Sequence, residues 1–348
     1  MLYQRESPHG GDVYGDPVLL DFSVNVNPLG MPKGVLAAVE EALPRLSQYP
    51  DPYCRRLVGK LAVREDVPTD WILCGNGAAE LIYAYGQALK PKKAVELAPT
   101  FSEYSRALEG CDIERYPLRQ SGGFVLDEAF LHYLKDTWPE TVFLCNPNNP
   151  TGRLIPEPLL EKILSFCKEK NIRVFLDECF LELSDRPQNR AGLLKKYENL
   201  LILKAFTKTY AMAGLRLGYC LTADVQLLRA MAERLQPWNV SIPAQAAGVA
   251  ALREKEYLQE TREMLDRERL WLTRALRNCG LWVCPSEANF ILFHGKEGLD
   301  RLVRQKGIAI RSCSNFHGLG RGWYRIAVRS REENEALLSA LAQCCEKE

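Results

Sequence analysis

Residues 70 to 222 alternate between short apolar runs and longer amphipathic stretches, and few folds fit this alternation. The apolar runs are seven strand candidates, at 71–74, 93–98, 112–117, 141–145, 172–177, 199–203 and 217–222. Between them lie segments with helical spacing, such as 78–90 (AAELIYAYGQALK) and 157–170 (EPLLEKILSFCKEK). The pattern predicts an α/β fold with a mostly parallel, seven-stranded sheet covered by helices. Ligands in such folds bind at the carboxyl ends of the strands.

The pattern changes after residue 225, and the change predicts a second, smaller domain. A charged stretch with helical spacing runs to about residue 278 and is interrupted by Pro237 and Pro243. Apolar runs follow at 281–283, 288–293, 308–311 and 323–328, and a last helix begins near residue 331. We therefore predict an N-terminal arm (1–30), a large domain (31–235) and a small α+β domain (236–348).

Composition narrows the possible functions. The 348 residues contain 45 Lys+Arg and 44 Asp+Glu without a basic block, which disfavours nucleic-acid binding. We find no apolar run of membrane-spanning length and no charged-then-apolar leader, so we expect a cytoplasmic protein that binds no membrane. The twelve cysteines form no CxxC pair and the four histidines show no ligand spacing, so we expect reduced thiols and no metal site.

A glycine turn follows the first strand candidate. In 71–86 (WILCGNGAAELIYAYG) this turn leads into a helix, so the N–H groups of Gly77 and Ala78 could face an anion. The segment is neither a Walker A motif nor a dinucleotide-binding glycine fingerprint. From the residues alone, an ordinary tight turn is as well supported as a phosphate-binding turn.

Amide and carboxylate side chains follow two other strands. In 143–156 (FLCNPNNPTGRLIP) we expect at least two of Asn146, Asn148 and Asn149 to cap turns, and one of them could face a ligand. Asp177 ends the strand 172–177, where a carboxylate is unfavourable unless it pairs with a cation or a hydrogen-bond donor. A helix N-cap is the alternative role for Asp177.

Two lysines four residues apart occur in the mostly apolar segment 204–219 (KAFTKTYAMAGLRLGY). Lysine is seldom placed in such surroundings unless its charge is paired or its amine is used chemically. The chain thus contains, in order, Asn-Pro-Thr-Gly at 149–152, Asp177, and Lys208 with Arg216 eight residues later. This ordered set resembles the fold-type I pyridoxal-phosphate (PLP) enzymes, the aspartate aminotransferase superfamily (class I/II), over nearly the whole chain.

The resemblance implies a PLP-dependent transferase fold whose large domain binds pyridoxal 5'-phosphate. Lys208 would bind the cofactor through its ε-amine, and Asp177 would pair with the protonated pyridine nitrogen. Asn149 would donate a hydrogen bond to the phenolic oxygen, and Phe101 would stack on the ring. These four residues would hold the cofactor ring.

The same resemblance implies a phosphate site and a dimer. Gly77 and Ala78 would cradle the cofactor phosphate, and Arg216 would neutralise its charge. Tyr49 matches a tyrosine that reaches the cofactor phosphate of the neighbouring subunit, which implies a homodimer with shared active sites.

Other positions refine this alignment. Eight residues after Lys204 stands Met212, which cannot neutralise a phosphate, so we expect Lys204 to lie at a strand end with its amine in solvent or paired to an acid. Ala205 replaces the usual phosphate-binding serine, and Thr207 is the candidate to compensate. Phe180 stands where the superfamily often has a tyrosine, which favours the decarboxylases among its members.

Within the superfamily, the chain resembles histidinol-phosphate aminotransferases and the threonine-phosphate decarboxylases of cobalamin synthesis. Stretches such as 9–11 (HGG) and 310–320 (IRSCSNFHGLG) are more similar to the decarboxylases. That branch implies that the N-terminal arm packs with the small domain and the substrate site. The residues implied to bind the phosphorylated amino acid are His9, Gly10, Asn25 and Arg311, with Arg325 on the α-carboxylate.

We therefore predict a PLP-dependent lyase that decarboxylates L-threonine O-3-phosphate, or L-serine phosphate, to the aminoalkyl phosphate. The alternative is an aminotransferase that acts on histidinol phosphate or a related amino acid with 2-oxoglutarate. A PLP-binding protein without chemistry would lack Lys208, Asp177 or Arg325, and all three are present. A dinucleotide-dependent oxidoreductase would carry the missing glycine fingerprint.

Overall fold

All seven predicted strands form one sheet in the computed structural model, which describes residues 9–345. The strands are β2 (Ile72–Gly75), β3 (Lys93–Ala98), β4 (Asp112–Pro117), β5 (Thr141–Cys145), β6 (Arg173–Asp177), β7 (Leu200–Ala205) and β8 (Gly218–Thr222). Their order is β2-β8-β7-β6-β5-β3-β4. Strand β8 runs antiparallel to both neighbours, and the other pairs are parallel, so the prediction of a mostly parallel sheet is confirmed.

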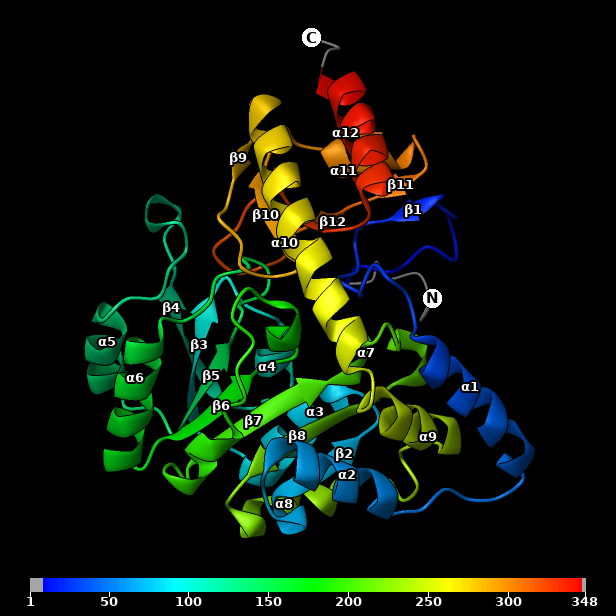
Figure 1. Cartoon of the computed structure of the whole chain (residues 1–348). Coiled ribbons are helices and arrows are strands. Elements are labelled where there is room, and N and C mark those ends of the chain that lie inside the picture. Colours follow the sequence, from blue (N-terminus) through cyan, green and yellow to red (C-terminus); the bar gives the residue numbers. More distant parts are fainter. Residues whose placement is uncertain (1–8, 346–348) are drawn as a thin grey trace.

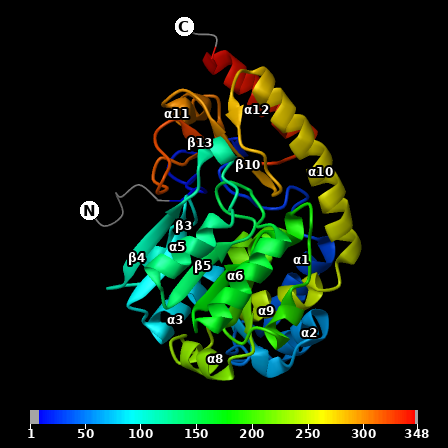
Figure 2. The ribbon, with the colours of Figure 1, turned by 90° about the vertical axis from the view of Figure 1, so that its left-hand side faces the viewer.

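Helices cover this sheet, and further helices follow along the chain as far as residue 345 (Figures 1 and 2). The α-helices are α1 (Lys33–Ala42), α2 (Arg55–Glu65), α3 (Ala78–Leu89), α4 (Glu103–Arg106), α5 (Ala129–Thr137), α6 (Glu157–Glu169), α7 (Phe206–Thr209), α8 (Val225–Ala232), α9 (Ile242–Ala251), α10 (Lys255–Asn278), α11 (Leu299–Arg304) and α12 (Arg331–Cys345). Short 3-10 helices lie at η2 (Leu43–Arg45), η3 (Thr69–Trp71), η4 (Gln120–Gly122), η5 (Leu181–Leu183), η6 (Ala191–Lys195) and η7 (Ala213–Leu215).

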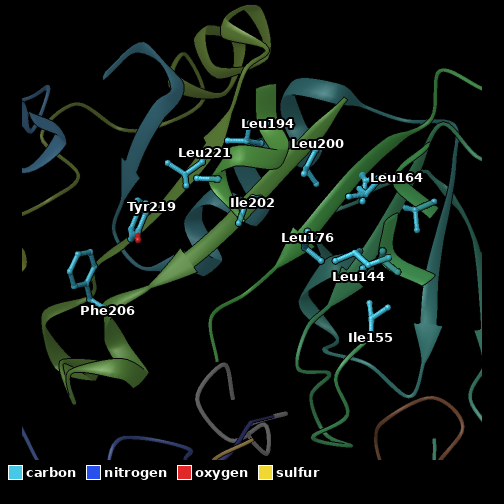
Figure 3. Close-up of a cluster of buried hydrophobic side chains, with 14 of the residues drawn as sticks. Leu144, Ile155, Leu164, Leu176, Leu194, Leu200, Ile202, Phe206, Tyr219 and Leu221 are labelled. Carbon is cyan, nitrogen blue, oxygen red and sulfur yellow. The ribbon is translucent and has the colours of Figure 1, made fainter. Parts of the chain in front are cut away.

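The central strands are apolar on both faces because both faces are covered. On β5, Val142 and Leu144 pack in one core cluster with Leu164 of α6, while Phe143 packs in another cluster with Leu81 of α3. Successive side chains of a strand point to opposite faces, so one strand serves both clusters. Figure 3 shows the first cluster, which continues across β6 and β7 toward β8.

The C-terminal part forms a separate antiparallel sheet in the order β12-β13-β10-β9. Its strands are β9 (Trp282–Val283), β10 (Phe290–His294), β12 (Arg311–Ser312) and β13 (Trp323–Ala327). The arm joins this part, because β1 (Leu20–Asp21) pairs in parallel with β11 (Ile308–Ala309). The long helix α10 leads from the large sheet up to α12 (Figure 1).

The predicted helical stretch 225–278 is three helices, α8, α9 and α10, and the two prolines explain the first interruption. Pro237 lies between α8 and α9, and Pro243 lies in the first turn of α9, where proline is tolerated. Helix α9 packs against α1 and α2, helices of the predicted large domain. The domain boundary at 235/236 stays a prediction. Between residues 9 and 345, no helix has the length and apolar character needed to span a bilayer.

Candidate active site

A cavity of about 290 Å³ lies where the carboxyl-end side of the large sheet meets the arm and the C-terminal strands. Twelve predicted site residues line it: His9, Gly10, Asn25, Ala78, Phe101, Asn149, Asp177, Thr207, Lys208, Arg216, Arg311 and Arg325. Of the other two, Gly77 adjoins the lining residue Ala78, whereas Tyr49 lies outside this cavity. Residues from three distant parts of the chain therefore converge on one space.

Asp177 ends β6 and is buried at the cavity wall. Its Oδ2 accepts a hydrogen bond from the Tyr104 hydroxyl at 2.6 Å, and its Oδ1 accepts one from the Cys179 N–H at 2.9 Å. Burial raises the pKa of Asp177, while these donors oppose the rise. The Cys179 contact closes a local turn rather than capping a helix. A carboxylate in this position suits a cationic ring nitrogen.

Lys208 lies in α7, directly after β7, and its side chain lines the cavity. Burial lowers the pKa of Lys208 to about 8, helped by the positive charges of Arg325 and Arg216. A lowered pKa makes more of the free amine available near neutral pH, which is what covalent capture of an aldehyde requires. The Asn27 N–H donates to the Lys208 carbonyl at 3.0 Å and ties the arm to this short helix.

Lys204 is buried in β7, where only Ala205 follows it, so its predicted place at a strand end is confirmed. Its Nζ donates to Glu65 Oε2 at 2.9 Å, and the Tyr219 hydroxyl donates to Glu65 Oε1 at 2.6 Å. Of the two alternatives from sequence, the acid partner is correct and the solvent-exposed amine is wrong. Lys204 does not line the cavity that contains Lys208.

An anion cradle forms at the start of α3. Gly77 is the N-cap with φ +84°, and a Cβ there would lie 2.4 Å from Arg216 Nη2, so the guanidinium lies directly against the turn. The first N–H groups of α3 have no acceptor within the helix. Ala205 and Thr207 line the same cavity, and Thr207 supplies a hydroxyl there. Guanidinium, helix N-terminus and hydroxyl together suit a phosphate.

The three asparagines of the 143–156 loop have different roles. Asn146 Oδ1 accepts from the Ile155 N–H at 2.8 Å, and Asn148 accepts from the Thr100 hydroxyl at 2.7 Å. Both therefore hold the loop, through partners nine and 48 residues away along the chain. Asn149 lines the cavity, and its Oδ1 accepts from Arg325 Nη1, which leaves the Nδ2 group as its donor.

Two arginines from neighbouring strands enter the cavity beside the arm. Arg325 on β13 is the register partner of Arg311 on β12. Arg325 also donates from Nη2 to the Ser23 carbonyl at 2.9 Å, while its buried Nε has no partner among the described residues. Burial, together with the charge of Arg311, lowers the pKa of Arg325 to about 10, so it stays cationic at neutral pH. A buried guanidinium with an unused N–H suits a carboxylate.

Several residues that hold the site were missed from the sequence. Tyr104 holds Asp177, Glu103 holds His9, and Ser23 holds both the arm and Arg325. Their partners lie far away along the chain, so no local spacing marks them. Glu103 and Tyr104 do follow Phe101 closely, two and three residues later in the TFSEY segment, which is the one signal that could have drawn attention to them.

The lining residues fit PLP. The cradle of Gly77, Ala78 and Arg216 matches its phosphate, Asp177 matches its ring nitrogen, and Lys208 matches its aldehyde. The model for the family described as Aminotransferase class I and II matches residues 17–341. The chain belongs to this family. Its members are PLP-dependent enzymes, so the expected fold, the expectation of a PLP-dependent enzyme and the expected cofactor are confirmed.

Proteins similar to this chain are named for two different activities, decarboxylation and amino-group transfer. It is 39% identical to the threonine-phosphate decarboxylase of Salmonella typhimurium over 96% of both chains. A histidinol-phosphate aminotransferase structure from Clostridium acetobutylicum has a TM-score of 0.88 and 30% identity, covering 95% of this chain and 100% of that chain. An L-threonine-O-3-phosphate decarboxylase structure from Porphyromonas gingivalis has a TM-score of 0.85 and 26% identity, covering 94% and 100%.

Proposed function

We propose that this enzyme decarboxylates a phosphorylated α-amino acid, L-threonine O-3-phosphate or L-serine phosphate, to the aminoalkyl phosphate and CO₂. The observation that carries the proposal is the pair of guanidinium groups, Arg325 and Arg311, in one cavity with Lys208 and beyond the Arg216 cradle. A substrate with both a carboxylate and a phosphate needs two such anchors. The 39% identity to a protein named threonine-phosphate decarboxylase supports the choice, and the product would serve cobalamin side-chain synthesis.

The two anchors have different surroundings, which suggests how they divide the substrate. Arg325 is buried and fixed by Asn149 and Ser23, and its Nε has no partner within residues 9–345, so it would bind the small α-carboxylate. Arg311 lines the same cavity as His9 and would bind the phosphate. Two anchors would fix the rotation about the N–Cα bond of the substrate, and this rotation would decide which bond at Cα breaks.

Lys208 would control the proton at Cα. PLP, when bound, supplies an electron sink for the bond that breaks at Cα. After CO₂ has left, the Lys208 ammonium would deliver the proton that replaces it on Cα. In the alternative reaction, transamination, Lys208 would instead remove the Cα proton. Because the structure of a histidinol-phosphate aminotransferase is similar to this chain, with a TM-score of 0.88, the experiment below also tests for transamination.

Two incubations separate the two reactions. The purified, PLP-loaded protein is given L-threonine O-3-phosphate without a keto acid, and CO₂ and the aminopropanol phosphate are measured. Release of both supports the proposal. Absence of CO₂, with 2-oxoglutarate consumed in the presence of histidinol phosphate, would show that the enzyme is an aminotransferase instead.

We also propose a homodimer in which Tyr49 reaches the partner's cofactor phosphate. Tyr49 is 77% exposed in the single chain and stacks on Trp238 with ring centroids 4.4 Å apart. Exposed apolar side chains surround it in sequence, including Leu46 and Tyr53. Such a concentration of exposed aromatic and aliphatic groups is typical of a subunit interface. Light scattering after size exclusion should give twice the chain mass of 39.4 kDa, and a monomer would refute the proposal.

A further inference from the structure

Glu103 is a carboxylate inside a cavity that is otherwise suited to anions. Among the described lining residues, three arginines and Lys208 are cationic, and the carboxylates are Asp177 and Glu103. Asp177 has a role in holding the cofactor ring, but nothing in the cofactor site calls for Glu103. A buried carboxylate repels an anionic substrate unless its own charge is neutralised.

Three hydrogen-bond donors compensate the negative charge of Glu103. Its Oε1 accepts from His9 Nε2 at 2.8 Å and from Arg106 Nη1 at 3.1 Å, and its Oε2 accepts from the Tyr83 hydroxyl at 2.8 Å. The hydrogen bond from His9 is the main reason that the pKa of Glu103 is lowered below its usual value. Glu103 is therefore an ionised acceptor at neutral pH.

The geometry makes Glu103 the fixed member of the pair and His9 the member that is held. The Glu103 side chain is 10% exposed and is bound on both oxygens, whereas the His9 side chain is 40% exposed. The His9 ring lies 5.8 Å from the ring of Phe101, the residue expected to face the cofactor. Glu103 thus holds the imidazole next to the reaction space.

A second attachment holds the other end of this short arm segment. Gly10 approaches Ser23 so closely that a Cβ would lie 2.4 Å from the Ser23 carbonyl oxygen, and the Gly11 N–H donates to Ser23 Oγ at 2.8 Å. The same Ser23 carbonyl accepts from Arg325. Residues 9–11 are therefore attached at one end to Glu103 on α4 and at the other to Ser23, which also binds Arg325.

We propose that Glu103 is a positioning residue for the substrate, acting through His9. It holds the His9 ring where it meets the phosphate of the substrate, and it thereby sets how strongly the enzyme prefers a phosphorylated amino acid to its unphosphorylated parent. The inference rests on the proposed function, because it assumes a phosphorylated substrate, but it holds for decarboxylation and transamination alike.

The test compares Glu103→Gln with the wild-type holoenzyme. Substrate binding is measured as the change in the cofactor absorbance band on titration with O-phospho-L-threonine and, separately, with L-threonine. We expect the dissociation constant for the phosphorylated ligand to rise about tenfold, the loss of roughly 1.4 kcal/mol, with L-threonine binding and kcat nearly unchanged. Glu109→Gln, an exposed glutamate in the same segment, is the matched control and should bind both ligands as the wild type does.

The combination with His9→Asn tests whether Glu103 acts through His9. If it does, Glu103→Gln adds little to the loss that His9→Asn alone causes, because the two changes remove one interaction. Equal, independent losses, or a Glu103→Gln variant that binds like Glu109→Gln, would overturn the inference. Should Glu103→Gln not fold, Glu103→Asp keeps the charge but shortens the reach to His9, and the same rise is expected. A wild type that binds both ligands equally would refute the proposed substrate class, which is a separate failure.

Discussion

Replacing Lys204 and Lys208 by methionine, one at a time, should separate stability from chemistry within a single five-residue segment. Methionine keeps an unbranched stem of similar length and removes the charge in both cases. Lys204 pairs with Glu65 in a buried site, where the two side chains are 6% and 1% exposed. Lys208 lines the active-site cavity among other cations.

The two substitutions should affect the stability of the apoprotein differently. Lys204→Met leaves Glu65 as a buried carboxylate without its cation, and breaking a buried pair from one side costs about 3–5 kcal/mol. At about 2 °C per kcal/mol, the melting temperature should fall by roughly 6–10 °C.

The charge of Lys208, in contrast, lowers the stability of the apoprotein. Its folded-state pKa, about 8, lies below the ordinary 10.5. The charged form is therefore disfavoured by folding at every pH below about 8, and this penalty fades as the pH rises toward 10.5. Lys208→Met should therefore leave the apoprotein at least as stable as the wild type at pH 7.

The assay has two readouts for each variant: thermal unfolding of the apoprotein, followed by circular dichroism at pH 7, and the visible absorbance of the protein after incubation with PLP. Lys204→Met should melt early and keep the cofactor band, and Lys208→Met should keep its melting temperature and lose the band. Lys195→Met, at a lysine whose side chain is 58% exposed, should change neither. Loss of the band in Lys204→Met, with retention in Lys208→Met, would refute the assignment of this whole segment.

Three further outcomes are expected. The rate at which the apoprotein captures PLP, followed by stopped-flow absorbance, should rise with pH and level off above about pH 8, because the Lys208 amine must be deprotonated. A rate that continues to rise up to pH 10 would contradict the lowered pKa of Lys208. Arg325→Lys cannot keep the fork that binds Asn149 and a carboxylate together, so kcat/KM should fall about 10- to 150-fold, the equivalent of roughly 1.5–3 kcal/mol for a charged hydrogen bond. Tyr104→Phe removes a hydrogen-bond donor that favours the ionised form of Asp177, so the pKa of Asp177 should rise further. PLP binding should then weaken about tenfold, measured by fluorescence titration of the apoprotein. An unchanged dissociation constant would mean that Tyr104 serves packing alone.

Much of the fold was readable from the sequence because its signals are local. Apolar runs of four to six residues between amphipathic stretches predict strands, and all seven appear within one or two residues of their predicted bounds. The prediction for Lys208 rested on a spacing of eight residues to Arg216. Both residues line one cavity, whereas Lys204 is held elsewhere.

The order of the strands could not be read in the same way. Strand β8 inserts antiparallel between β2 and β7, and β3 lies between β5 and β4. Local propensity says that a segment is a strand, but not which strand it pairs with, because pairing is decided by burial across the whole domain.

Within the site, the sequence alone determined which residue types are available, and the tertiary structure decided which of them act together. Three asparagines follow β5, and only the packing of the loop turns two of them to backbone groups and Asn149 to the cavity. Glu103 meets His9 across 94 positions of sequence, and Tyr104 meets Asp177 across 73. Such contacts form because strand ends, arm and C-terminal sheet enclose one low-dielectric space, where each buried polar group must find its partner.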